Sequence, residues 1–361
     1  MKFLKKYKKL HIWLLVDLVV IALFLLLRGN RALMNALTTY VTEPLKRGLA
    51  ALAYLVEFSV AEMLYAIAFG GGILLLCVAV RALAQSRKRW QLLYRMVLGT
   101  VCTALSVYAA FSLLWGVNYY TDTFQDKSGI YGREASVEEL KQLTEFFAQK
   151  AAQTALGVKR DADGFYAEDR QDIFAASTGI YENIYAEFPF LRQEDRVPKA
   201  LVCSDVCSLL DFTGFFFPFT GEANLNVHSP AVYLPTTIVH ELAHQRGIAS
   251  EQECNFIAIA AATASDDPVY QYAGWLMAYV HTSNALYRVD QDKWKEIREA
   301  LPYEVRLDLY ENSLYWQSME GPLANISSVA YDSMLKNYGD EDGVQSYGTV
   351  VDMLITYYLD K

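Results

Sequence analysis

Three long apolar stretches in the first third of the chain constrain its fold more than any other feature. They cover about residues 12–28, 60–82 and 94–116 of the 361 residues. At about 1.5 Å of helical rise per residue, each stretch comes close to or exceeds the roughly 30 Å hydrocarbon core of a bilayer. We therefore predict a membrane domain with three transmembrane helices in residues 1–117 and a second domain in residues 118–361.

The first apolar stretch follows a lysine-rich N-terminus that resembles the start of a signal peptide. No small-x-small cleavage motif follows it, and two further apolar stretches come after it. We therefore interpret it as an uncleaved anchor that stays in the membrane. Asp17 lies within this stretch, and we interpret it as an interfacial or packed residue rather than a proton carrier.

The basic residues predict the orientation of the chain. Five lysines in residues 2–9 and a basic cluster in residues 81–95 outnumber the four basic residues between the first two stretches. Loops rich in Lys and Arg stay in the cytoplasm, so we predict a cytoplasmic N-terminus. Three crossings then place residues 118–361 on the extracytoplasmic side, although the four basic residues on that side reduce the contrast.

The two predicted domains differ in charge. Residues 1–117 carry a net charge of +10 and residues 118–361 a net charge of −19, which together give the −9 of the chain. An acidic domain is poorly suited to bind nucleic acid, because phosphate needs basic surface to offset its charge. We therefore expect a lipid bilayer as a partner and no nucleic acid.

The five cysteines give little information about redox state. Only Cys203 and Cys207 are close in sequence, and no second pair suggests a zinc site built from cysteines. The pair fits either an extracytoplasmic disulfide or two small apolar packing residues, and we favour packing.

Residues 240–244 read His-Glu-Leu-Ala-His and follow an apolar run that predicts a helix. Positions i and i+4 share one face of a helix, so His240 and His244 can bind one Zn²⁺ ion. Glu241 projects close to the same site, where its carboxylate can hold and deprotonate water on the ion. The alternative is a buried helix in which both histidines only satisfy local hydrogen bonds.

A zinc site of this kind needs a third protein ligand, and Glu251 and Glu253 follow closely. The intervening glycine and serine predict a sharp turn into a second helix, whose first turn then lies back against His244. Glu251 shares a helix face with Asn255, whose amide can orient a ligand from the second shell. Glu253 instead fits a capping box or a first-turn acid favoured by the helix dipole. We therefore predict Glu251 as the third ligand.

Further residues are candidates for contact with a substrate. His281, Tyr272 and Tyr347 are possible donors to an oxyanion, and Glu222 and Asn224 are possible substrate-binding residues. A lone histidine and any one of the 25 tyrosines can equally be packing residues.

The rest of the second domain reads as helical with a short β region. We predict helices over about 136–156 and 171–187, strands over 198–204 and 214–218, a turn at 220–224, a strand leading to residue 235, and mainly helix after residue 264 with breaks near 290, 302, 321 and 339. A strand before the metal helix suits a protease, because an extended peptide can pair with its edge. The alternative is a hairpin that only supports the helix.

Six segments together resemble domain-of-unknown-function family 3810: Phe58–Glu62, Trp115–Tyr120, Gly214–Asn224, His240–Gly247, Glu251–Phe256 and Ser346–Gly348. The resemblance covers essentially the whole chain and implies a bacterial membrane protein whose C-terminal part is a zincin-like metallopeptidase domain.

The Glu251-x-x-x-Asn255 segment also resembles the Glu-x-x-x-Asp helix of thermolysin-like peptidases, in which the glutamate is the third zinc ligand. Asn255 replaces the aspartate and carries no charge, so it should raise the basicity of a ligand histidine less. The interval from His244 to Glu251 is much shorter than in those enzymes, so no homology to them is implied.

These patterns together predict a mainly α protein with a small β-sheet, in which three transmembrane helices precede a zincin-like domain. We expect a membrane-anchored, gluzincin-like zinc metallopeptidase with one Zn²⁺ ion and a peptide or protein substrate. Two alternatives stay open: a non-catalytic zinc-binding receptor or assembly factor, and a zinc amidohydrolase that acts on a cell-envelope amide.

Overall fold

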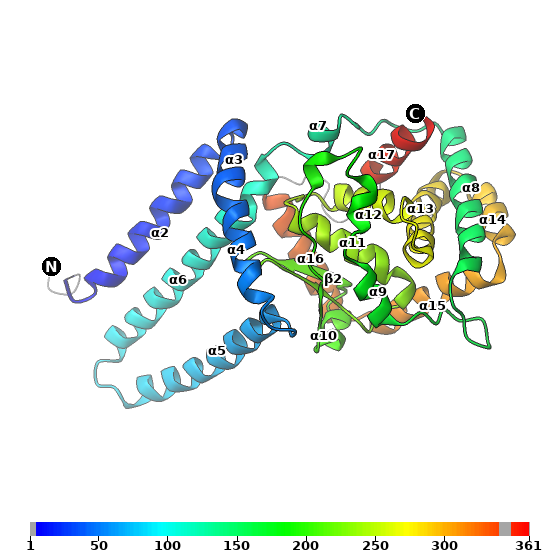
Figure 1. The fold of residues 1–361 in the computed structure, drawn as a ribbon. Coiled ribbons are helices and arrows are strands. Elements are labelled where there is room, and N and C mark those ends of the chain that lie inside the picture. The colour runs from blue at the N-terminus through cyan, green and yellow to red at the C-terminus, as the bar shows by residue number, and fades with distance from the viewer. Residues whose placement is uncertain (1–4, 339–347, 361) are drawn as a thin grey trace. The chain divides into compact units, whose positions relative to one another are not determined.

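The computed structural model describes residues 5–338 and 348–360, and it is mainly helical with one small sheet (Figure 1). The chain divides into two compact units. The first contains the N-terminal residues up to 56, residues 60–121 and residues 218–221, and the second contains the remaining residues.

Three helices of the first unit are long and apolar enough to cross a membrane: α2 (Lys8–Leu27), α5 (Val60–Gln85) and α6 (Arg89–Leu114). They confirm the three predicted stretches. None of the apolar window of α5 is buried within the structure, and only 11% of that of α2 and 17% of that of α6 are buried. Exposing so much apolar surface to water costs about 25 cal/mol per Å². The first unit is therefore compatible with a membrane protein.

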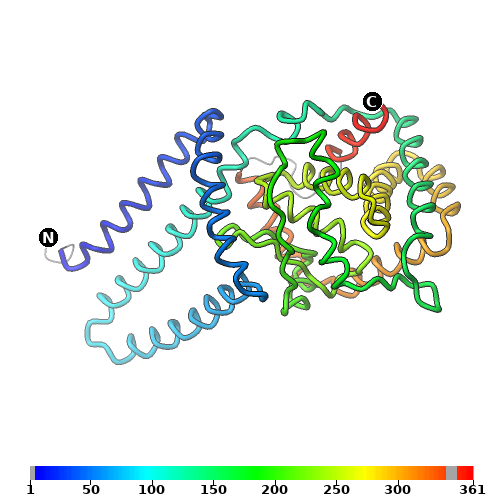
Figure 2. Tube along the Cα trace, viewed as in Figure 1, coloured from blue at the N-terminus to red at the C-terminus, as the bar shows by residue number. Residues whose placement is uncertain are grey.

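Helices α2 and α6 run side by side, and a short turn joins α6 to α5 (Figure 2). Asp17 of α2 is only 7% exposed, and the Ser106 hydroxyl on α6 donates to both of its carboxylate oxygens at 3.0 Å. Trp13 donates its indole N–H to the same hydroxyl at 2.7 Å. Asp17 is thus a packed residue with local hydrogen bonds, which agrees with the prediction.

The segment between α2 and α5 is helical rather than a plain connection. It contains α3 (Arg31–Leu37), a π-helical turn (Thr38–Thr42) and α4 (Glu43–Ala53). The Asn30 side chain caps α3 by accepting the Leu33 N–H at 3.1 Å. Pro44 stands in the first turn of α4, directly after the π-helical turn, so the chain before it is already helical.

The second unit is built mainly from helices. Their bounds are α7 (Phe124–Ser128), α8 (Val137–Thr154), α9 (Arg170–Ala176), α10 (Ser204–Leu209), α11 (Leu234–Gln245), α12 (Glu251–Thr263), α13 (Pro268–Val289), α14 (Gln291–Ala300), α15 (Tyr303–Met319), α16 (Pro322–Asn337) and α17 (Gly348–Leu359). Helix α8 begins with a capping box between Ser136 and Glu139, as its sequence predicts. The expected helix over 171–187 is interrupted, because Gly179 adopts a left-handed φ of 102° and a 3₁₀ turn (Ile180–Ile184) follows it.

The sheet has three short strands: β1 (Lys199–Ala200), β2 (Gly214–Phe217) and β3 (Glu222–Leu225). Strand β3 is central and fully buried, parallel to β1 and antiparallel to β2. The strand expected over 198–204 is shorter because the chain turns into α10, where the Ser204 hydroxyl donates to the Leu201 carbonyl. The turn expected at 220–224 is also displaced: it ends at Gly221, which has a φ of 68°, and β3 begins at the next residue.

Helices α11, α12 and α13 form the centre of the second unit, with α8 packed on α13 (Figure 1). Gly274 allows α12 and α13 to approach closely. A Cβ atom at this position would lie 2.9 Å from the Ala262 Cβ atom and 2.9 Å from the Thr263 nitrogen, which is closer than real Cβ contacts. Because interiors of this kind are close-packed, α11 and α12 are held rigidly in the core.

Candidate metal centre

A helix, a tight turn and a second helix bring the candidate ligands together. Helix α11 ends at Gln245, and Gly247 takes the left-handed conformation with a φ of 85°. Gly247 and Ile248 donate their N–H groups back to carbonyls in the last turn of α11. This is a Schellman motif, which glycine permits at little steric cost. Ser250 then caps α12, so the first turn of α12 lies against the last turn of α11.

The Glu251 carboxylate lies between the two histidines of the His-Glu-Leu-Ala-His motif. Its Oε2 atom is 3.1 Å from His240 Nε2, and its Oε1 atom is 3.4 Å from His244 Nε2. The two imidazole rings stand 4.8 Å apart at 83°. Burial opposes ionisation of Glu251, but the two imidazoles outweigh it and hold the pKa of the carboxyl well below its ordinary value. Two nitrogen donors and one carboxylate therefore face one point.

This donor set fits a catalytic zinc ion. Two imidazoles and one carboxylate are a common set of protein ligands for such an ion, and they leave a coordination position open for water or substrate. The three side chains are 7–16% exposed, so solvent can reach the point on which they converge.

The other ring nitrogen of each histidine is also engaged. His240 Nδ1 lies 2.8 Å from Asn255 Oδ1, and His244 Nδ1 lies 2.8 Å from the Ile248 carbonyl. Both partners are acceptors, so Nδ1 of each ring can donate to them, which would leave Nε2 of each ring to bind a metal ion. Outer hydrogen bonds of this kind fix the orientation of a metal ligand.

Cys254 is close enough to both histidines to form an alternative metal-binding group with them. Its Sγ atom, however, lies 3.3 Å from His244 Nδ1, whereas Glu251 faces Nε2 of the same ring. Burial raises the pKa of this thiol to about 12. The geometry therefore favours Glu251 as the third ligand and makes Cys254 a neighbour of the Nδ1 atom.

Glu253 has a different role from Glu251. Its carboxylate accepts the backbone N–H groups of Phe124 at 2.9 Å and Gln125 at 3.1 Å, at the N-terminus of α7. The Glu253 carboxylate therefore binds the start of α7 instead of completing a capping box at the start of its own helix, α12. Ser250 supplies only the other half of that box, because its hydroxyl accepts the Glu253 N–H.

Glu241 lies beside the histidine pair and is only 4% exposed. Its Oε2 atom is buried and has no hydrogen-bond partner among the described residues, whereas the backbone of Phe216 bonds to the carboxylate. Burial raises the pKa of Glu241 above its ordinary value. Strand β2 approaches closely because Gly214 has no side chain: a Cβ atom there would lie 3.1 Å from both Glu241 Cγ and Oε1.

The three predicted oxyanion donors, His281, Tyr272 and Tyr347, do not share one environment. His281 on α13 is partly buried, and burial together with His240 lowers its pKa to about 4, which favours the neutral imidazole. Tyr272 donates its hydroxyl to Asp308, which also forms an ion pair with Arg160, so this tyrosine belongs to a buried polar network. Tyr347 lies outside the described residues.

Glu222 and Asn224 lie in the central strand and have no exposed surface. Asn224 accepts a hydrogen bond from the Ser59 hydroxyl at 2.6 Å and donates to the Glu222 carbonyl at 3.2 Å. Their role as substrate-binding residues stays a prediction, and their burial gives it no support.

Tyr331 on α16 is a candidate site residue that the sequence analysis missed. Its hydroxyl donates to Glu251 Oε1 at 2.6 Å, and its ring packs edge-on against Phe212. It lies 80 residues after Glu251, and no local pattern distinguishes it from the other tyrosines.

The family model described as a protein of unknown function (DUF3810) matches residues 38–355. The chain belongs to this family. The match confirms the family resemblance and includes every residue of the candidate metal centre in this DUF3810 protein. No curated protein and no solved structure matches the chain.

We predict that the purified full chain binds one zinc ion, and that His240→Ala, His244→Ala or Glu251→Ala each weakens binding by more than about 100-fold. Each change removes a donor atom that faces the common point. Losing such a donor should reduce zinc affinity more than losing an outer hydrogen-bond partner, which typically costs about 10- to 100-fold. Metal content by elemental analysis and titration calorimetry measures the effect.

Glu253→Ala and Cys254→Ala are the matched controls and should keep stoichiometric zinc. Glu253→Ala should still lower thermal stability, because two N–H groups of α7 lose their acceptor at a cost of about 1–3 kcal/mol. Loss of zinc from either control, together with its retention in Glu251→Ala, would show that the ligand set is wrong.

We further predict that Tyr331→Phe weakens zinc binding about 10-fold, because the Glu251 carboxylate loses the donor that orients it. The phenylalanine keeps the ring contact with Phe212. Tyr310→Phe serves as the control, since the Tyr310 side chain is 56% exposed. Equal zinc affinity in both variants would exclude an orienting role for Tyr331.

Proposed function

We propose that this protein is a membrane-anchored zinc metallopeptidase of the His-Glu-x-x-His type, with a gluzincin-like ligand set and a zincin-like domain. One observation carries the proposal: the Nε2 atoms of His240 and His244 and the carboxylate of Glu251 face one point, and a second buried carboxylate stands beside them. A histidine pair at i and i+4 with a glutamate between is typical of metallopeptidases.

His240, His244 and Glu251 would hold the ion. A zinc ion in this position supplies a Lewis acid that polarises a carbonyl and lowers the pKa of a water molecule toward about 7. Asn255 and the Ile248 carbonyl keep the two imidazoles in the orientation that presents Nε2.

Glu241 is the residue that moves the proton. Its buried Oε2 atom has no partner within the described part of the chain, so it can accept the proton of the attacking water. The raised pKa of Glu241 lets the same group give that proton to the leaving amine. His281, whose pKa is lowered to about 4, is a candidate to donate a hydrogen bond to the oxyanion, whereas the Tyr331 hydroxyl already donates its proton to Glu251.

We predict that Glu241→Gln keeps its zinc and loses hydrolysis of peptides by about 10²- to 10⁴-fold, because an amide cannot accept the proton. Zinc content and the cleavage rate of a mixed peptide library, read by mass spectrometry, are measured on the same preparation. Glu138→Gln makes the same chemical change on an exposed side chain and should leave both quantities unchanged.

The same experiment separates the alternatives. Unchanged hydrolysis in zinc-loaded Glu241→Gln would exclude this mechanism. If zinc-loaded wild type cleaves no peptide, cell-envelope amides are offered next. Cleavage of these would favour an amidohydrolase, and no cleavage would favour a receptor or assembly factor.

We also propose that the N-terminus is cytoplasmic, that the second unit is extracytoplasmic, and that the membrane is a bacterial cell membrane. The support is the excess of basic residues before α2 and around the turn between α5 and α6, together with three helices that can each cross once.

We predict that a reporter active only outside the cytoplasm works when fused after Tyr120 or after Lys361. The same reporter should be inactive when inserted into the turn at residues 86–88. The two fusions, after Tyr120 and after Lys361, and the insertion are compared at equal expression levels. The reverse pattern would put the metal centre in the cytoplasm.

A further inference from the structure

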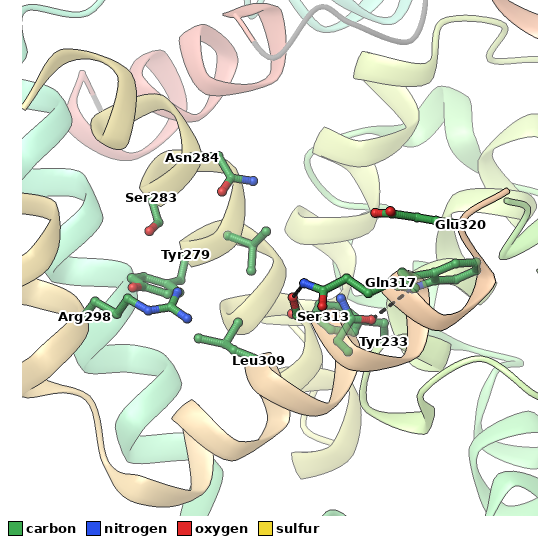
Figure 3. A pocket seen from close by; sticks show the side chains of 12 residues that line it. Tyr233, Tyr279, Ser283, Asn284, Arg298, Leu309, Ser313, Gln317 and Glu320 are labelled. Carbon is green, nitrogen blue, oxygen red and sulfur yellow. Dashed lines mark hydrogen bonds between the residues drawn. The ribbon is translucent and has the colours of Figure 1, made fainter. Parts of the chain in front are cut away.

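A pocket separate from the metal ligands opens between α13, α14 and α15 (Figure 3). Its volume is about 390 Å³, which lies within the range of about 300–1,000 Å³ that is usual for ligand sites. The side chains that matter here are Tyr279, Ser283, Asn284, Arg298, Trp316 and Glu320.

One end of this pocket is rich in hydrogen-bond donors. The exposed side chain of Arg298 forms no ion pair or hydrogen bond with any described residue, and the Trp294 ring lies 5.3 Å from its guanidinium. Figure 3 shows Arg298 next to Tyr279, whose residue is 1% exposed. The Tyr279 hydroxyl is buried beside Ser283 but makes no hydrogen bond of normal geometry. A guanidinium that lacks an anionic partner, with hydroxyls beside it, is arranged to bind a carboxylate.

The remaining wall of the pocket suits a peptide. Trp316 and Leu309 offer aromatic and aliphatic surface, and Trp316 donates its indole N–H to Asn312 at 3.2 Å. Gln317 and Asn312 add amide groups that can pair with peptide bonds. Glu320 lies at the end away from Arg298 in Figure 3, so it would repel a carboxylate there and favour its placement at Arg298.

A phosphate group matches the pocket less well. Arg298 is the only cation among its lining residues, whereas a dianion generally needs more than one positive group. The strongly acidic composition of residues 118–361 also disfavours a dianion.

Helices α11 and α13 connect the pocket with the candidate metal centre. Tyr233 lines the pocket and lies at the N-terminus of α11, seven residues or about 10 Å along the helix before His240. Helix α13 contributes Val280 to the pocket and carries His281, whose pKa His240 influences.

We propose that this pocket binds the free C-terminal carboxylate of a short peptide, with the carboxylate on Arg298 and the preceding residues on the wall formed by Trp316 and Leu309. The proposal rests on the proposed peptidase function in naming the peptide as the substrate. The metal centre would then act on peptides close to their free C-terminus.

The test uses the full chain in detergent as the zinc-loaded Glu241→Gln variant, so that bound peptides are not cleaved. The probe is a mixture of randomised tetrapeptides, offered as free acids and separately as C-terminal amides, and retained peptides are identified by mass spectrometry. We expect at least about 10-fold greater retention of the acids, corresponding to about 1.4 kcal/mol. Adding Arg298→Gln should abolish this preference, and Tyr279→Phe should reduce it.

Lys295→Gln is the matched control, because it removes one positive charge from the same helix at a side chain that is 68% exposed and does not line the pocket. It should keep the preference for acids. Equal retention of acids and amides, or a preference that survives Arg298→Gln, would overturn the proposal. Displacement of the acids by an equal concentration of inorganic phosphate would also overturn it, in favour of a general anion site.

Failure of this proposal can be distinguished from failure of the proposed function. Retention of acids by a chain that cleaves nothing would support the pocket and exclude the peptidase. Cleavage of acids and amides at equal rates by the wild-type chain would support the peptidase and exclude this role of the pocket.

Discussion

The left-handed turn at Gly247 is the constraint on which the candidate metal centre depends. It ends α11 one residue after the helix cap and sends the chain directly into α12, so Glu251 returns to the face that carries His240 and His244. Any residue with a side chain would adopt this conformation at a cost of about 1–2 kcal/mol. The same turn places the Ile248 carbonyl on His244 Nδ1. One backbone conformation thus positions Glu251 and orients the His244 ring.

Environment, not residue type, separates the roles of three glutamates that lie within thirteen positions. Glu251 faces two imidazoles, which stabilise its charged form. Glu241 is buried beside β2, and its Oε2 atom has no hydrogen-bond partner among the described residues. Burial raises the pKa of this carboxyl. Glu253 accepts two backbone N–H groups of α7 and so fixes that helix to the core. The proposed ligand, the proposed base and the helix cap therefore differ in hydrogen bonding and burial at each position.

Much of the fold follows from local patterns in the sequence. Apolar length alone predicts α2, α5 and α6, because a bilayer requires about 20 apolar residues in a helix. The capping box at Ser136 predicts the start of α8. Short elements follow less closely from local patterns. Strand β1 has only two residues, and a 3₁₀ turn replaces the expected continuation of helix after α9. Chain reversals and buried partners decide such short elements more than residue propensity does. No element is predicted for the segment that forms α3 and α4.

The sequence by itself determined the spacing of His240, Glu241 and His244, since the helical period puts i and i+4 on one face, and it favoured Glu251 over Glu253 through the face shared with Asn255. Only the tertiary structure decided what lies opposite that face. Tyr331 reaches Glu251 from 80 residues away, and Glu253 binds the start of α7 from 129 residues away. The pocket around Arg298 likewise joins three helices with the start of α11. These contacts depend on how helices pack against one another, and helix packing leaves no periodic signal at a single tyrosine or arginine.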